Sequence, residues 1–103
     1  MTRRVRVLPS ADRDIDEHIA FIARERPDAA LRFMDAVTTI FDHISGMSGM
    51  GSMRNYRNTR LRGLRIIPVS GFENFLVFYL VTTKTVDIVR VLHAARNFDN
   101  IFS

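Results

Sequence analysis

The sequence contains no cysteine among its 103 residues, no tryptophan and a single lysine. Without cysteine, a chain has no disulfide, no thiolate metal site and no cysteine nucleophile. The longest apolar run, residues 75–81, is far too short to span a bilayer. The basic N-terminus is not followed by the apolar segment of a secretory signal. We therefore expect a cytoplasmic protein.

Acidic residues are scarce in the second half of the chain. The net charge is +4, and residues 46–103 carry eight basic side chains against three acidic ones. Five arginines follow one another with no acid between them: Arg54, Arg57, Arg60, Arg62 and Arg65. Such a block attracts nucleic acid or an acidic protein segment. The alternative is a solvated loop and strand edge, which is the usual fate of surface charge.

The first 25 residues have the pattern of a strand followed by a helix. Residues 3–8 alternate between apolar and basic side chains, which is typical of a short strand. Pro9 is expected to end this strand, and Ser10 to cap a helix that runs to about Glu25. The apolar residues of that helix form one stripe: Ala11, Ile15, Ile19 and Ile22.

A second helix is predicted to follow almost at once. Pro27 is suited to its first turn, and Gly46 is placed to end it in a left-handed conformation. Its apolar residues recur at helical spacing: Ala30, Phe33, Val37, Ile40, Phe41 and Ile44. Because the connection between the two helices is so short, we expect an antiparallel helical hairpin.

The rest of the chain predicts a loop, three strands and a docked tail. Residues 45–59 are rich in glycine, serine and threonine and form the loop. The strands are expected at residues 64–69, 75–81 and 86–93, and the tail is expected to dock as a short helix through Phe98, Ile101 and Phe102. The result is one α+β domain over residues 1–103, in the order β-α-α-β-β-β, with the helical hairpin packed on a small, mainly antiparallel sheet.

Side chains that could carry chemistry gather near the C-terminus. Arg90, His93 and Arg96 follow one another on and after the last strand, and Arg65 lies on a strand of the same predicted sheet. Arginine and histidine on one surface can cleave RNA, with histidine as acid or base and arginine beside a phosphate. The alternative is a histidine that caps a strand end, among solvated arginines.

No metal or cofactor is expected from the histidines and glycines. His18, His43 and His93 are far apart in the sequence, and the residues around them form no zinc-binding motif. The glycines match no phosphate-binding loop.

Two predicted helices carry apolar residues outside their core stripes. Phe21 lies off the stripe of the first helix, and Leu31 and Met34 lie outside or at the edge of that of the second. Exposed side chains of this kind suit a partner helix or strand. Alternatively, the sheet or the C-terminal tail covers them.

Over nearly its whole length the chain resembles the ParE branch of the RelE/ParE toxin superfamily. The resemblance begins with LPSA at residues 8–11 and continues at Pro27, where the second helix opens. It is clearest in GFENFLVFY at residues 71–79 and IVRVLHAARN at residues 88–97. One departure is Ser48, which stands ahead of Gly51 where the family often has a proline.

The resemblance implies a toxin of a bacterial type II toxin–antitoxin pair. ParE-like toxins inhibit DNA gyrase by binding, and a ParD-like antitoxin neutralises them by wrapping its C-terminal segment around the toxin. Operator DNA would be bound through the antitoxin. The branch has no established catalytic residue to transfer, so we expect no enzyme. Arg65, Arg90, His93 and Arg96 are then candidates for target binding. The candidates for antitoxin binding are Phe21, Leu31, Met34, Arg54, Arg57, Arg60 and Arg62.

Two other functions are open within the same fold. RelE-like relatives cleave mRNA on the ribosome and often carry a tyrosine in the C-terminal segment. Here no tyrosine follows Tyr79, and the tail has Phe98 and Phe102, whose rings cannot exchange a proton. His93 and Arg96 nevertheless remain available to such a reaction. The third function is that of a non-toxic protein that only helps its antitoxin to repress transcription.

Overall fold

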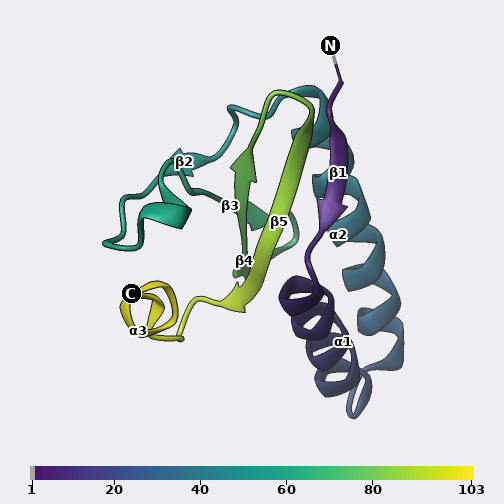
Figure 1. Cartoon of the computed structure of the whole chain (residues 1–103). Coiled ribbons are helices and arrows are strands. Elements are labelled where there is room, and N and C mark those ends of the chain that lie inside the picture. Colours follow the sequence, from purple (N-terminus) through teal and green to yellow (C-terminus); the bar gives the residue numbers. More distant parts are fainter. Residues whose placement is uncertain (1) are drawn as a thin grey trace.

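The computed structural model describes residues 2–103 and contains a five-stranded sheet with helices on both faces (Figure 1). The elements in chain order are β1 (Arg4–Val7), α1 (Pro9–Ala23), α2 (Pro27–Gly46), β2 (Ser52–Met53), the 3₁₀ turn η1 (Thr59–Leu61), β3 (Arg65–Val69), β4 (Phe72–Val81), β5 (Thr85–His93) and α3 (Phe98–Phe102). The α+β class and the helical hairpin are as predicted. No helix among the described residues is long and apolar enough to cross a membrane.

The sheet has the order β1-β5-β4-β3-β2. Its first strand, β1, runs parallel to β5, whereas the other neighbouring pairs are antiparallel. The helices α1 and α2 lie on one side of the sheet, and α3 and the loop that carries η1 lie on the other (Figure 1). The sheet is therefore mainly antiparallel, as expected.

Each face of the sheet has its own hydrophobic core. On the side of the hairpin, Val77 and Tyr79 of β4 pack with Phe33 of α2. On the other side, Phe78 packs with Phe102 of α3. Successive side chains of a strand point to opposite faces, so a strand covered on both sides is apolar throughout. This explains the uninterrupted apolar run of β4 and confirms the predicted docking of the tail.

The first helix begins and ends earlier than predicted. Pro9 is its first residue, and Leu8, in an extended conformation, occupies the cap position without a side-chain hydrogen bond. Proline suits the first helical position because its missing N–H would have no partner there. The predicted Ser10 cap is therefore wrong: the Ser10 hydroxyl donates to the carbonyl of Val89 on β5. The helix ends at Ala23 rather than near Glu25.

The predicted left-handed glycine at the end of α2 is also wrong. Pro27 does open this helix, but Gly46 is its last residue, and the positive φ angles of the described residues belong to Gly63 and Gly71. The chain instead leaves the helix through Met47, at φ −135°, whose N–H still donates to the carbonyl of His43 at 2.8 Å.

The long loop contains a short strand that the sequence does not reveal. In β2, Ser52 pairs with Ile66 and Met53 with Arg65 at the edge of the sheet. Two residues are too few to show an alternating pattern. Further along β3, the register with β4 shifts between Pro68 and Val69.

Candidate functional site

Side chains on one face of α1 form hydrogen bonds with the backbone of β5, in the place where a neighbouring strand would otherwise pair with it. Ser10, Asp14 and His18 are spaced by four residues and therefore share a helix face. The Ser10 hydroxyl donates to the carbonyl of Val89 at 2.9 Å, and Asp14 Oδ2 accepts the N–H of Val91 at 3.0 Å. His18 Nε2 lies 2.7 Å from the carbonyl of Val91, so this nitrogen carries the hydrogen.

These contacts begin where the ladder between β1 and β5 ends. The last register pair of that ladder is Val7 with Ile88, and the N–H of Leu8 also reaches the carbonyl of Ile88 at 3.0 Å. Beyond this point, side chains of α1 provide the hydrogen-bond partners for the backbone groups at the edge of β5. An unpaired buried peptide group costs about 1–3 kcal/mol, so this arrangement determines where α1 sits on the sheet.

Arg90, a candidate for target binding, is held by an ion pair with Asp14. Its Nε and Nη2 donate to the two carboxylate oxygens at 2.7 and 2.9 Å. The hydrogen bonds that Arg90 donates to Asp14 raise the pKa of Arg90 above its usual value. The carboxylate is buried, and it also holds the N–H of Val91. Arg90 therefore serves first to fix α1 against β5.

His93 and Arg96 lie together at the end of β5. The N–H of Ala95 donates to Nδ1 of His93 at 3.1 Å, and the N–H of Arg96 donates to the carbonyl of His93 at 3.0 Å. The ring of His93 stands edge-on to Phe75, with centroids 5.3 Å apart. His93 is partly exposed and Arg96 is exposed, so both are open to a partner at this end of the sheet.

Arg65 lies at a different place on the sheet. It pairs with Tyr79 of β4, whereas His93 pairs with Phe75, four residues along the same strand. At about 3.3 Å per residue, the two positions are roughly 13 Å apart along the strand alone. The side chain of Arg65 donates to the carbonyl of Gly51 at 2.7 Å. The four target-binding candidates therefore do not form one cluster.

The buried hydroxyl of Tyr79 anchors the loop that Arg65 contacts. It donates to the carbonyl of Ser48 at 2.9 Å and accepts the N–H of Gly51 at 2.8 Å. Burial raises the pKa of Tyr79 above its usual value of 10.0. A side chain at position 51 would come within 2.7 Å of this hydroxyl and 2.9 Å of the carbonyl of Ile66. The loop is thus fixed from inside although Ser48 replaces the proline often found there.

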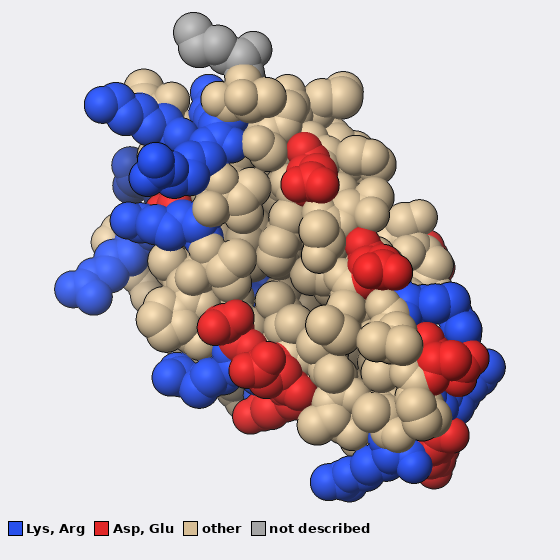
Figure 2. Space-filling view, turned by 90° about the vertical axis from the view of Figure 1, so that its right-hand side faces the viewer, with Lys and Arg blue, Asp and Glu red and all other residues tan. Residues whose placement is uncertain are grey.

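The three apolar antitoxin-binding candidates are exposed on the helical hairpin. Phe21, Leu31 and Met34 are 69%, 64% and 44% exposed. Neither the sheet nor the tail covers them, so the alternative of covered side chains is wrong, and their contact with a partner stays a prediction. Phe21 also lines a shallow cavity of about 290 Å³ at the connection between α1 and α2. On this side of the molecule, residues other than Lys, Arg, Asp and Glu form most of the middle of the surface, acidic side chains lie among them, and basic side chains gather at the margins (Figure 2).

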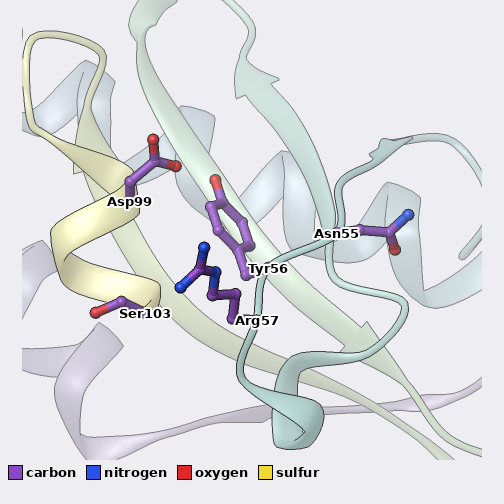
Figure 3. A pocket seen from close by; sticks show the side chains of 5 residues that line it. All are labelled: Asn55, Tyr56, Arg57, Asp99 and Ser103. Carbon is purple, nitrogen blue, oxygen red and sulfur yellow. The ribbon is translucent and has the colours of Figure 1, made fainter.

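The basic candidates lie beyond the opposite face of the sheet. Arg54, Arg57, Arg60 and Arg62 are exposed on the segment that joins β2 to β3. A hollow of about 400 Å³ separates this segment from α3. Tyr56 and Arg57 line it from the loop, and Asp99 and Ser103 line it from α3 and the end of the chain (Figure 3).

The comparisons with known proteins agree with this architecture. The chain has the fold of a solved structure described as "Chromosomal ParDE TA system from P. aeruginosa", with a TM-score of 0.72 and 16% identity. The match covers 89% of this chain and 96% of that one. A family model described as "ParE toxin of type II toxin-antitoxin system, parDE" matches residues 5–98, so the chain belongs to the ParE toxin family. No curated protein matches it.

Membership of a toxin–antitoxin family implies an antitoxin partner. The resemblance noted in the sequence is thereby confirmed at the level of the family and the fold.

Among residues 2–103, no three histidine, aspartate or glutamate side chains are grouped as they would be to hold a metal ion.

Proposed function

We propose that this ParE toxin inhibits DNA gyrase by binding to it, and that a ParD-like antitoxin neutralises it. The match of the ParE family model to residues 5–98 carries the proposal. Inhibition by binding requires a complementary surface rather than a catalytic acid or base, and the end of β5 offers His93 and Arg96 to a partner.

The state of the candidate nuclease residues supports binding over cleavage. Arg90 already neutralises Asp14 through two hydrogen bonds, so it is not free to face a phosphate. Nδ1 of His93 accepts the N–H of Ala95. The two tail phenylalanines, Phe98 and Phe102, pack against Phe78 with centroids 5.0 and 4.8 Å apart. They have no proton to transfer.

A supercoiling assay tests the proposal. Purified gyrase and relaxed plasmid are incubated with increasing amounts of the protein, with and without the cognate antitoxin. We expect supercoiling to be lost without antitoxin and restored with it. His93→Ala and Arg96→Ala should weaken inhibition, whereas Arg24→Ala, an exposed arginine at the end of α1, should not. Full gyrase activity at a large molar excess of folded toxin contradicts the proposal.

Ribosome-dependent mRNA cleavage is the second candidate function. One observation favours it: His93 and Arg96 are adjacent and open to a partner at the end of β5. Primer extension on translated mRNA, after induction of the toxin, would reveal cuts positioned by codons. We expect none. Cuts that disappear in His93→Ala would establish cleavage instead of gyrase inhibition.

For the antitoxin, we propose an acidic, amphipathic segment that binds both sides of the toxin. Phe21, Leu31 and Met34 provide apolar anchors on the hairpin, which typically carry most of the affinity. The arginines between β2 and β3 would add association rate and register. Because the molecule extends 39 × 33 × 21 Å, one extended segment needs about 12 residues to pass along its longest dimension. Because the apolar anchors and the arginines lie on opposite sides of the sheet, a segment that contacts both would wrap around the toxin.

Charge introduced at the anchors separates this proposal from general surface effects. Phe21→Asp, Leu31→Asp and Met34→Asp should each weaken antitoxin binding at least tenfold, or about 1.4 kcal/mol. Thr39→Asp adds the same charge at another exposed position of α2 and should have little effect. If all four variants bind alike, the hairpin is not the antitoxin site. Operator DNA should bind the toxin only when the antitoxin is present.

A further inference from the structure

Three methionines are spaced by three residues in the connection between α2 and β2. Residues 47–53 read Met-Ser-Gly-Met-Gly-Ser-Met, and these are three of the five methionines in the chain. All three side chains are exposed. They contribute nothing to either core, although methionine is an apolar residue that normally fills core gaps. Their thioethers are therefore open to a ligand from solvent.

The backbone of this segment is bound to the protein on its inner side. Tyr79 bonds the carbonyl of Ser48 and the N–H of Gly51, and Arg65 bonds the carbonyl of Gly51. The peptide groups therefore face the sheet, and the methionines are left toward solvent. A 3.1 Å hydrogen bond from the N–H of Met50 to the carbonyl of Met47 closes a turn between the first two.

Met47 and Met50 are brought together by the turn, and Met53 follows in β2. The turn brings the Cα atoms of Met47 and Met50 within about 7 Å. The step from Met50 to Met53 spans at most about 11 Å. A methionine side chain has three rotatable bonds and a polarisable thioether, so neighbouring sulfurs of this segment can adjust toward a shared ligand.

We propose that Met47, Met50 and Met53 form a binding site for a soft monovalent cation, Cu(I). Thioether ligands select Cu(I) over the harder divalent ions. These ligands bring no negative charge, and Arg54 and Arg65 are close by, so a divalent ion would meet more repulsion and no compensating carboxylate. His43, also exposed, lies one helical turn before Met47 and supplies an imidazole as a fourth ligand.

The site differs from metal sites built on histidine and carboxylate spacing, because its ligands are mainly thioethers. It is independent of gyrase inhibition, because it lies between the end of α2 and β2 and uses neither His93 nor Arg96. An ion held there would join the end of α2 to the edge strand β2.

Silver(I) titration of the full chain tests the site, since Ag(I) has the same preference for thioethers and does not change oxidation state in air. Calorimetry in chloride-free buffer should show one ion per chain. Competition with a chromophoric Cu(I) chelator under anaerobic conditions should give the same stoichiometry. Zn(II) should not compete, because it prefers nitrogen and thiolate ligands.

The variants are chosen so that the fold is preserved. Met50→Leu conserves volume at an exposed position and should weaken Ag(I) binding at least about tenfold. Met34→Leu is the matched control, because Met34 is 44% exposed and Met50 43%, and it should leave the affinity unchanged. His43→Ala should weaken binding less than Met50→Leu. Absence of stoichiometric Ag(I) binding, or equal affinities of the Met50 and Met34 variants, overturns the proposal.

Discussion

The contact between Gly51 and Tyr79 provides the sharpest test of how the α2–β2 connection is fixed. A Cβ at position 51 would lie 2.7 Å from the hydroxyl of Tyr79, 2.9 Å from the carbonyl of Ile66 and 3.0 Å from Cε1 of Tyr79. Tyr79 is fully buried and Ile66 belongs to β3, so neither can move freely. Overpacking of this kind costs about 1–3 kcal/mol.

Gly51→Ala should therefore lower the free energy of unfolding. Part of the cost is offset, because alanine restricts the unfolded chain and returns about 0.4–1 kcal/mol. We expect a net loss of about 1–2 kcal/mol. For a domain of this size, that corresponds to a fall in Tm of roughly 4–16 °C. Urea denaturation and thermal unfolding followed by circular dichroism measure both quantities.

Gly49→Ala is the matched control within the same loop. No atom lies within 4 Å of a Cβ at position 49, and Gly49 does not have a positive φ. This variant should be neutral or slightly more stable than the parent protein. Unfolding free energies of the two variants that agree to within about 0.5 kcal/mol would refute the reasoning.

Removal of the Tyr79 hydroxyl links the strain to a particular atom. Tyr79→Phe alone should cost about 1–3 kcal/mol, because Gly51 N–H and Ser48 C=O each lose a partner. In the double variant with Gly51→Ala, the nearest clash is gone. The combined loss should be smaller than the sum of the single losses by at least about 0.5 kcal/mol. A strictly additive result would show that the carbonyl of Ile66 causes the strain.

Three further predictions concern stability. Asp14→Asn should lower the free energy of unfolding by at least about 2 kcal/mol, because it removes the charge that holds Arg90. Asp12→Asn, in the exposed first turn of α1, should lower it by about 1 kcal/mol or less. Chemical denaturation measures both losses, and equal losses would contradict the prediction. Tyr79 has a raised pKa, so the unfolded chain releases this proton first as the pH rises above 10.0. The unfolding free energy should therefore fall as the pH rises above 10.0, and fall less steeply in Tyr79→Phe; parallel slopes in urea titrations would exclude the effect. Phe102→Ala should cost about 3–5 kcal/mol, since this side chain is 3% exposed, and a change below about 1 kcal/mol would mean that α3 is not docked in solution.

The sequence predicted the elements that have long, regular patterns. The six apolar residues of α2 repeat at helical spacing, and the uninterrupted apolar run of β4 indicated cover on both faces. Both expectations follow from burial, which acts on every residue of an element. The short strand β2 was missed because its two residues are held by pairing with β3 rather than by any pattern of their own.

The ends of the helices were predicted less well, because they depend on tertiary contacts. Ser10 had the sequence signature of a cap, but its hydroxyl is used by β5. The same holds for the candidate site. Nothing in the sequence distinguishes Arg90 from an arginine that faces solvent. Only the folded structure, which places Asp14 beside it, shows that Arg90 is paired. A spacing of four from Ser10 to Asp14 to His18 was visible, but a polar stripe usually indicates a solvated face.

The parallel pairing of β1 with β5 has a consequence for the synthesis of this toxin. Residues 4–7 are synthesised before the other strands, yet their partners are residues 85–88. At ~5–20 residues per second, translation separates the two by roughly 4–16 s. The strand of the sheet that is made last, β5, lies between β1 and β4. A nascent chain therefore cannot complete the sheet until β5 has been made, and a binding surface built on β5 forms only then.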